Sequence, residues 1–559
     1  MSSKRISCAL SILLSLSVAS GVQSQIHDPR AIEADPATAQ DPIAPVLDGL
    51  GEHHIEVTTT NPRSQYFFDQ GLRLTYGFNH SEALRAFKEA VRLDPDNAMA
   101  YWGWALVLGP NLNLPMQPEV VEQAWSALQM AVARKELVSA RERAYIEALE
   151  HRFAAEVLED RSLLDTEYAT AMEELVEEYP DDLDAATLYA AALMNLSPWD
   201  YWYLDGRPKE NAEQILEVLE SVTSRDPNHP GAIHYYIHAV EARHPEKGVE
   251  GADRLVSLMP GAGHMVHMPS HIYMRIGRYA DSYEVNRIAA EVDEEYIAQC
   301  RAQGLYPLGY FPHNIHFMAW AAMFQGRSAQ ALAASRRVAE KIPEELVGNA
   351  FGLYETFLSQ PIYTMVRFGD WTGVLEEPEP AEEARFMRGA WHYARALAYV
   401  NAGDSSLAAT ELEQLEVLRD AVQEEEYAIG FGAAGTLLTI GSEIVHGEMA
   451  AATSDYPEAL SHLERAVRLE DSLLYNEPPD WYFPVRHILG AVLLEAGRAS
   501  EAEVVYWQDL RKNPDNGYAL FGLAQSLRAQ KRHDEAAEAT ERFEMAWSEA
   551  DHELRTSRF

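Results

Sequence analysis

A 34-residue pattern of small, apolar and turn-forming residues constrains this fold more than any other feature of the sequence. Residues 64–97 carry the pattern at unit positions 8, 20, 24, 27 and 32, which are Gly71, Ala83, Phe87, Ala90 and Pro95. Glycine and alanine let two helices approach closely, and proline does not continue a helix. The pattern predicts a helix, a turn and a second helix packed on the first.

The same spacing recurs along nearly the whole chain, in units that contain Ser282 and Ala289, Gly326 and Ala331, Ala459 and Ala466, and Gly490 and Ala502. It resembles the tetratricopeptide repeat, whose unit has 34 residues. The resemblance implies an all-α, right-handed superhelical α-solenoid of about eleven or twelve helix pairs. The strings HMPSHIYMR and PHNIHF also resemble those of exported bacterial proteins with this repeat, which implies no particular reaction.

The first residues are typical of a secretory signal peptide. Lys4 and Arg5 precede an uncharged stretch, and small residues around Ser20 and Ser24 suit cleavage after either position. We expect residues 1–24 to be the signal peptide, 25–60 a flexible leader, 61–547 the repeats and 548–559 a C-terminal tail. The mature chain is therefore expected to be secreted or periplasmic, and no later segment predicts a membrane span.

The charge balance limits the partners. The chain has 45 Lys+Arg and 87 Asp+Glu, for a net charge of −42. Such a field repels phosphate backbones and attracts cations. Nucleic acid is therefore a poor partner, and a metal ion is a reasonable one.

Common catalytic motifs are missing from the sequence. It has no HExxH, CxxC, GxSxG or P-loop string, which argues against the familiar zinc protease, thioredoxin, hydrolase and nucleotide-binding classes. Gly430, Gly432 and Gly435 form a GxGxxG string, but the flanking residues predict helix with no preceding strand. We expect close helix packing there. The single cysteine beyond the signal peptide, Cys300, is expected to be a buried thiol.

Seven of the twenty histidines fall on the predicted first helices of three successive units: His234, His238, His264, His267, His271, His313 and His316. In the repeat register that the resemblance implies, most of them occupy positions that line the concave groove. Spacings of three and four residues also place side chains on one helix face. Neighbouring helices pack roughly 8–10 Å apart, so the imidazoles can converge on one ion. The pattern predicts a transition-metal site, and scattered surface or capping histidines are the alternative.

Asn79, His80 and Glu241 are second-tier candidates for the same groove. Glu241 follows His238 by three residues and could add a ligand or a base, whereas Asn79 could equally serve the turn between two helices. Copper or zinc is the expected ion, and iron stays open, because all three accept imidazole. The interleaved Met265 and Met268 favour copper slightly.

Three functions remain open. The first is an exported binding protein whose His-rich concave groove holds a metal ion together with a peptide, protein or small-molecule ligand. The second is a metal-dependent enzyme in which the histidines leave a coordination position for water or oxygen. The third is metal storage or delivery.

Overall fold

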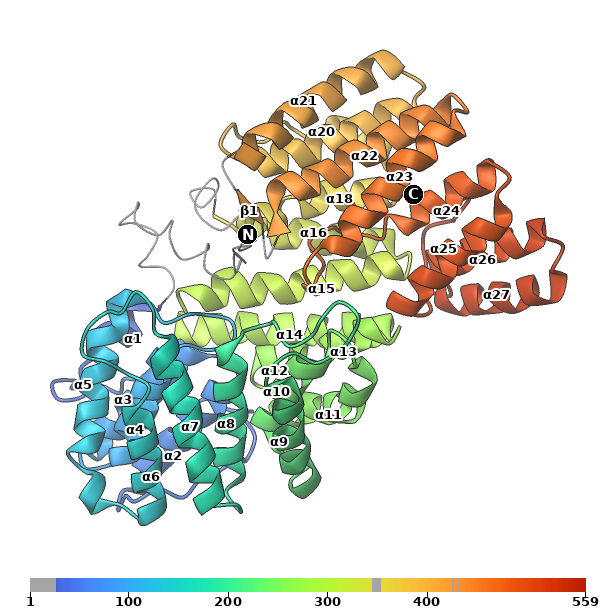
Figure 1. The fold of residues 1–559 in the computed structure, drawn as a ribbon. Coiled ribbons are helices and arrows are strands. Elements are labelled where there is room, and N and C mark those ends of the chain that lie inside the picture. The colour runs from blue at the N-terminus through green and yellow to red at the C-terminus, as the bar shows by residue number, and fades with distance from the viewer. Residues whose placement is uncertain (1–26, 344–352, 425–426, 430–431) are drawn as a thin grey trace, which may run out of the picture. The chain divides into compact units, whose positions relative to one another are not determined.

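The computed structural model describes residues 27–343, 353–424, 427–429 and 432–559 (Figure 1). The predicted signal peptide lies outside these residues. The chain folds into two compact units. The N-terminal unit contains residues 25–276 and 284–314, and the C-terminal unit contains residues 277–283 and 315–559.

The N-terminal unit consists of paired helices. Its elements, with α14 and α15 contributing to both units, are α1 (Pro29–Glu33), α2 (Pro62–Tyr76), α3 (His80–Leu93), α4 (Ala98–Leu108), the 3₁₀ turn Pro118–Val120, α5 (Val121–Val132), the 3₁₀ turn Lys135–Leu137, α6 (Ala140–Glu150), α7 (Ser162–Glu178), α8 (Leu183–Leu196), α9 (Ala212–Arg225), α10 (Pro230–Val240), α11 (Pro245–Leu258), α12 (Gly263–His267), α13 (Pro269–Arg275), α14 (Tyr279–Cys300), the π-helical turn Tyr306–Tyr310 and α15 (Phe311–Phe324).

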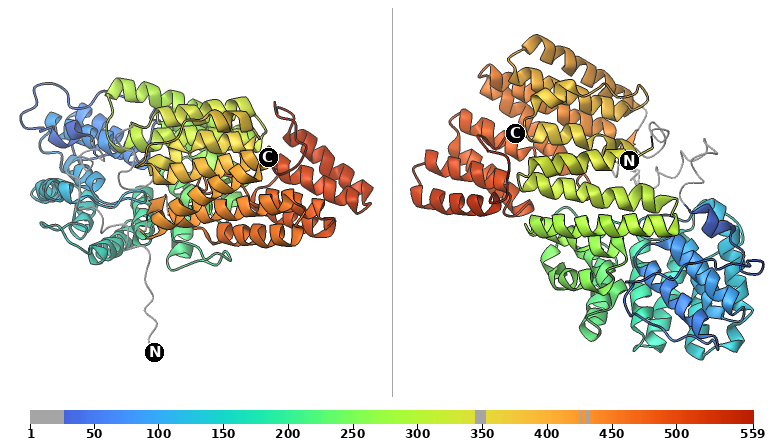
Figure 2. Two further views of the ribbon diagram at one scale, coloured as in Figure 1. Left: turned by 90° about the horizontal axis from the view of Figure 1, so that it is seen from above. Right: turned by 180° about the vertical axis from the view of Figure 1, so that it is seen from behind.

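The C-terminal unit continues with helix pairs, which Figure 2 shows from two further directions. Its elements are α16 (Ser328–Glu340), α17 (Leu353–Leu358), α18 (Gln360–Arg367), α19 (Trp371–Glu376), α20 (Arg385–Asn401), α21 (Ser405–Glu424), β1 (Ala428–Ile429), β2 (Gly432–Ala433), α22 (Ala434–Ala452), α23 (Tyr456–Ser472), α24 (Arg486–Glu495), α25 (Ala499–Lys512), α26 (Gly517–Ala529) and α27 (His533–Ala546). The prediction of an all-α fold is confirmed.

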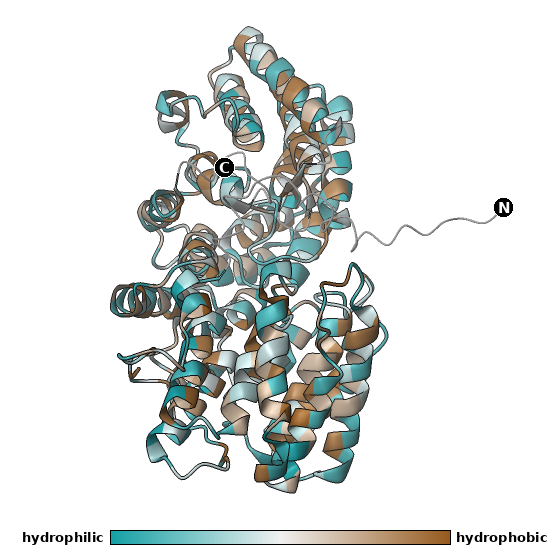
Figure 3. Ribbon diagram, turned by 90° about the vertical axis from the view of Figure 1, so that its left-hand side faces the viewer, coloured by the Kyte–Doolittle hydropathy of each residue, from teal (hydrophilic) through white to brown (hydrophobic). Residues whose placement is uncertain are grey.

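The glycines of the repeat pattern make room for an aromatic ring. A Cβ atom at Gly71 of α2 or Gly103 of α4 would overlap the Phe87 ring of α3. In the C-terminal unit, Gly490 and Gly522 flank Tyr506 in the same way. The ring of one unit therefore packs between the first helices of two successive units, which explains the 34-residue spacing. Figure 3 shows that single helices carry both apolar and hydrophilic stretches, as expected when one face is buried.

The predicted flexible leader is packed on α2 and α3 from residue 27 onward. Ala31 and Leu47 are buried in the core. The Lys88 ammonium donates to the carbonyls of Ala31, Ile32 and Ala34 at 2.7–3.0 Å. The leader was predicted to be flexible because it is rich in Pro, Ala and Asp and has no sustained apolar period. In the structure, polar side chains from the helices bind its backbone.

The predicted C-terminal tail is also packed on its own unit. Asp551 accepts hydrogen bonds from the backbone of Ser328 and Ala329 at the start of α16. Tyr506 and Ser557 are joined by a 2.7 Å hydrogen bond between their hydroxyls. The tail therefore completes the last repeats.

The GxGxxG segment differs from the expected continuous helix. Among the residues described there, Ala428–Ile429 and Gly432–Ala433 form a short antiparallel pair, and Gly430 lies outside the description. Gly435 begins α22, where an added Cβ would press on Gln423, so close helix packing holds at that position. Across the described residues, none of the helices combines the length and apolar character needed to cross a membrane.

Candidate metal centre

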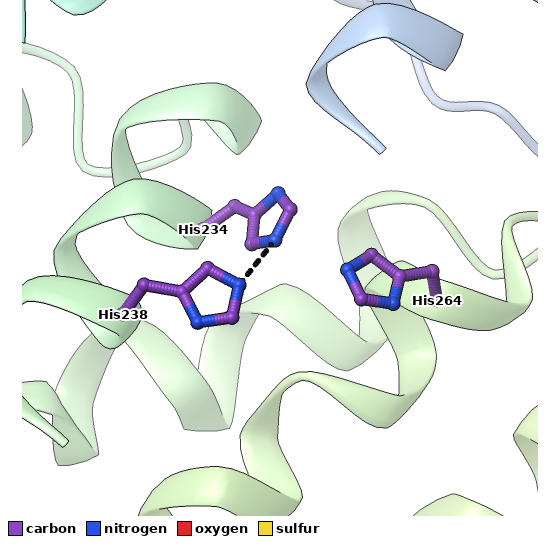
Figure 4. A group of neighbouring side chains, drawn as sticks. All are labelled: His234, His238 and His264. Carbon is purple, nitrogen blue, oxygen red and sulfur yellow. Dashed lines mark hydrogen bonds between the residues drawn. The ribbon is translucent and has the colours of Figure 1, made fainter. Parts of the chain in front are cut away.

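Three histidine rings from α10 and α12 face one another in the N-terminal unit (Figure 4). His234 and His238 lie one turn apart on α10, and His264 lies on α12. One ring nitrogen from each lies within 4.8 Å of the others, and none of the side chains is more than 3% exposed. Both ring nitrogens of His264 lack a hydrogen-bond partner among the described residues. We call these three residues the first histidine group.

Hydrogen bonds fix which nitrogens of this group carry lone pairs. The Nδ1 atom of His234 lies 2.6 Å from the Tyr76 carbonyl, which can only accept, so His234 Nδ1 carries the hydrogen. The Tyr76 carbonyl is at the C-terminus of α2, where carbonyls lack helical partners. The Nδ1 atom of His238 lies 3.4 Å from Glu241 Oε1 and donates likewise. The Nε2 lone pairs of His234 and His238 therefore face each other across 3.1 Å.

A second histidine group repeats this arrangement with residues from α12, α13 and α15. His267 ends α12, His271 lies on α13, and His313 lies near the start of α15. Pro269 separates α12 from α13 because proline has no N–H for the helical ladder. One ring nitrogen from each histidine again lies within 4.8 Å of the others. His267 and His271 are buried, and His313 is half-buried.

In the second group, His267 repeats this hydrogen bonding, and His271 makes an ion-pair contact instead. His267 Nδ1 donates to the Asn286 side-chain oxygen at 2.6 Å. His271 Nδ1 lies 2.9 Å from Glu241 Oε2. The Nε2 atoms of His267 and His271 are 2.9 Å apart, so these two rings again bring their Nε2 atoms together.

The buried rings are held in their neutral form. Burial is the main cause that lowers the pKa of His234, His238, His264 and His267 well below the usual 6.5, and neighbouring imidazoles lower it further. Protonation of one ring, which would let two facing nitrogens share a hydrogen, is therefore disfavoured. A metal ion removes the repulsion between the lone pairs without protonating a ring.

The nitrogen separations fit a transition metal. A metal–nitrogen distance of about 2.0–2.1 Å in tetrahedral geometry places ligand nitrogens about 3.3 Å apart. The Nε2 pairs, at 3.1 Å and 2.9 Å, lie close to that value. Ligating histidines also donate their other N–H to a carbonyl or carboxylate oxygen, and His234, His238 and His267 each bond an oxygen through Nδ1. Each group offers three imidazoles, which is one ligand fewer than a closed tetrahedral site requires.

Aromatic rings enclose the first group. Phe78 lies 4.5 Å from the His234 ring between centroids, and it stacks on His238 and His264 at 6.0 Å and 5.6 Å. Phe78 has φ of +54°, a conformation that a bulky residue adopts only under strain. Tyr310, the last residue of the π-helical turn, lies 4.8 Å from His264. These rings exclude water from the nitrogens.

A third cluster, formed by His53, Asp184 and His229, does not fit a metal. Asp184 Oδ1 accepts hydrogen bonds from His53 Nε2 at 2.7 Å and from the Tyr76 hydroxyl at 2.6 Å, and His229 Nε2 lies 3.3 Å away. His229 Nδ1 accepts from the backbone of Ala232 as a helix cap. His229 therefore has no ring lone pair left for a metal, and Asp184 Oδ1 already accepts two hydrogen bonds. This cluster joins the segment before α2 to α8 and α10.

The three second-tier candidates, Glu241, Asn79 and His80, differ in their contacts with the histidine groups. Glu241 lies between the two groups and contacts a ring of each. Asn79 accepts a hydrogen bond from the Tyr296 hydroxyl, and His80 Nδ1 accepts one from Asn111. His80 therefore faces the insert between α4 and α5. The Phe78 ring lies between the His80 ring and the His234 ring.

His316 belongs to the C-terminal unit and to neither histidine group. Its ring lies 5.8 Å from Phe357, and burial lowers its pKa to about 4. The six other predicted histidines come together in the two histidine groups. From the sequence, we expected these rings to line a concave groove. In the structure five of the six rings are buried, and only His313 is half-buried.

Sequence reasoning missed the residues that orient the rings. The Tyr76 carbonyl and the Asn286 amide come from other helices, and a carbonyl leaves no signal in the sequence. Phe78 carried one weak signal, since it precedes the Asn79 turn and must adopt a left-handed backbone there.

Comparison with known proteins supports the repeat. The family model described as tetratricopeptide repeat matches residues 488–550, so the predicted family is confirmed there. The chain is similar to the human IFIT1 dimer with m7Gppp-AAAA (13% identity, 87% of this chain and 90% of that chain, TM-score 0.31). It is also similar to yeast Tom70 (12% identity, 89% and 93%, TM-score 0.29). Likenesses at these scores carry no argument about partner or function. None of the curated proteins compared matches the sequence.

Proposed function

We propose that this tetratricopeptide-repeat protein is an exported metal-binding protein that holds a transition-metal ion in its buried histidine groups. The observation that carries the proposal is the facing pair of Nε2 lone pairs in His234 and His238, whose other nitrogens are already hydrogen-bonded. Copper or zinc suits three neutral imidazoles, and iron is the third choice. The signal-like residues 1–24 support export to the periplasm or medium.

Partner binding is the role to which the fold is suited. Tetratricopeptide repeats present extended surfaces that bind peptides or proteins, and residues 488–550 match this family. In this proposal the ion organises the N-terminal unit, while the repeats supply a surface for a peptide, protein or small ligand. The acidic charge argues against nucleic acid as that ligand.

The ligand count also favours a second function, a metal-dependent enzyme. Each group offers three imidazoles, the number found in catalytic zinc sites that keep a position for water. The half-buried His313 gives the second group its contact with the surface. Addition of azide to the cobalt-substituted protein tests this point, because an open position gives a changed Co²⁺ absorption spectrum and a closed one does not.

Metal content is the direct test of binding. We expect full-length protein purified from its native compartment to contain a stoichiometric transition metal, and His238→Gln to contain less. His316→Gln is the matched control, since it removes a buried imidazole that belongs to neither group. Equal metal content in wild type and in variants of both groups would overturn the proposal.

A further inference from the structure

Glu241 reaches both histidine groups. It follows the last residue of α10, is fully buried, and places Oε1 3.4 Å from His238 Nδ1 and Oε2 2.9 Å from His271 Nδ1. Each oxygen of this one carboxylate therefore contacts a ring of a different group, Oε1 through a hydrogen bond with His238 and Oε2 through a close ion-pair contact with His271.

The two groups have matching hydrogen-bond patterns. Each contains a histidine pair spaced by four residues, and one ring of each pair donates to an uncharged oxygen, either the Tyr76 carbonyl or the Asn286 amide. The other ring of each pair faces Glu241. In both pairs the two Nε2 atoms lie close together, at 3.1 Å and 2.9 Å.

The groups are also neighbours in space. The rings of His238 and His271 lie 5.5 Å apart between centroids, and those of His264 and His267 lie 5.8 Å apart. Two bound ions would therefore be separated by little more than these ring contacts. The negative charge of Glu241, which is costly to bury alone, would lie between two cations.

We infer that the chain binds two transition-metal ions as one coupled centre, with Glu241 as the positioning residue shared by both. The inference rests on the proposed metal binding and adds the number of ions and the role of Glu241. Each ion takes three imidazole nitrogens, from His234, His238 and His264 or from His267, His271 and His313. The Glu241 carboxylate accepts from His238 Nδ1 and lies against His271 Nδ1, and its charge favours the tautomers that leave Nε2 to the metal.

Titration of the metal-free full chain with Cu²⁺ tests the stoichiometry. We expect two equivalents to bind and the electron paramagnetic resonance spectrum to show magnetic coupling between them. His238→Gln and His271→Gln should each retain one equivalent with an uncoupled spectrum. One equivalent in the wild type would overturn this inference while leaving the proposed function intact, whereas no binding would overturn both.

Variants of Glu241 test its role. A glutamine side chain at this position can accept from only one ring, and its NH₂ group forces the other ring into the tautomer that places hydrogen on Nε2. We therefore expect Glu241→Gln to lower the affinity for one metal equivalent by about 10–100-fold and to leave the affinity for the other unchanged. Glu241→Ala should lower the affinity for both metal equivalents. Glu246→Gln, which changes an exposed residue of α11, should lower neither affinity. If Glu241→Ala keeps both affinities and the coupled spectrum, Glu241 has no positioning role.

Discussion

The Nε2 atoms of His234 and His238 lie 3.1 Å apart, and each ring has its other nitrogen bound to an oxygen that accepts a hydrogen. Two neutral imidazoles in this geometry repel unless a cation lies between them. The Nε2 atoms of His267 and His271 are likewise close, at 2.9 Å. The hydrogen bonding of the N-terminal unit therefore supports the proposed cation site, which does not depend on exposed acidic side chains.

Removal of the ion should destabilise the protein. A ligand that binds only the folded state stabilises it by about 2.7 kcal/mol when its free concentration is a hundred times the dissociation constant. We expect a chelator to lower the melting temperature of the wild type measured by circular dichroism. The His267→Ala/His271→Ala variant should lose metal and respond less to chelator. An equal chelator response in both proteins would contradict the assignment.

That double variant should also be less stable in the absence of metal. The sequence register placed these rings on an open concave face, where their loss would leave the core intact. In the structure His267 and His271 are at most 4% exposed, so truncation leaves a cavity and removes the hydrogen bond between His267 and Asn286. The helical signal should persist while the melting temperature of the metal-free protein falls.

Phe78 should control how fast the ion escapes. Its ring covers the first group, and its truncation to alanine should cost about 3–5 kcal/mol as well as admit water. We expect Phe78→Ala to release metal to a chelator faster than the wild type in stopped-flow measurements. Phe78→Leu keeps an apolar wall and serves as the control. Identical release rates in all three proteins would show that Phe78 is not the barrier.

Much of the fold and part of the site follow from local spacing. The positions of Gly71, Ala83 and Ala90 predict the helix pair because they fix a contact within one unit. The separation of four residues between His234 and His238 predicts a shared face for the same reason. Both are short-range relationships that a sequence displays directly.

Long-range contacts account for what the sequence could not show. The Tyr76 carbonyl that fixes the His234 tautomer lies 158 residues away along the chain. Residues 27–60 looked flexible because their backbone partners, such as Lys88 and Gln70, belong to later helices. His316 shares its predicted face with His313 but lies in the other unit, a division that the repeat register does not reveal.

Gly103 should tolerate no larger residue while Phe87 is present. A methyl group at Gly103 would overlap the Phe87 ring, and such overpacking typically costs about 1–3 kcal/mol. We expect Gly103→Ala to lower the free energy of unfolding measured in urea. Phe87→Leu should recover part of that loss when combined with Gly103→Ala, because a smaller side chain relieves the overlap. Strict additivity of the two changes would show that the ring and the glycine do not interact as described.

The stability of the N-terminal unit should depend on pH through the Asp184 carboxylate. Burial acts to raise the pKa of Asp184, but hydrogen bonds and charge from His229 and His53 outweigh it and hold the pKa below its usual range. The folded state therefore binds a proton more weakly than the unfolded state, whose carboxyl titrates near pH 3.9. The stabilisation is fully present above that pH and is lost as the pH falls through the folded-state pKa. In urea unfolding, the advantage of the wild type over Asp184→Asn should be constant from pH 7 to pH 5 and shrink below about pH 4. An advantage that instead grows as the pH falls would mean that Asp184 is not held ionised by these histidines.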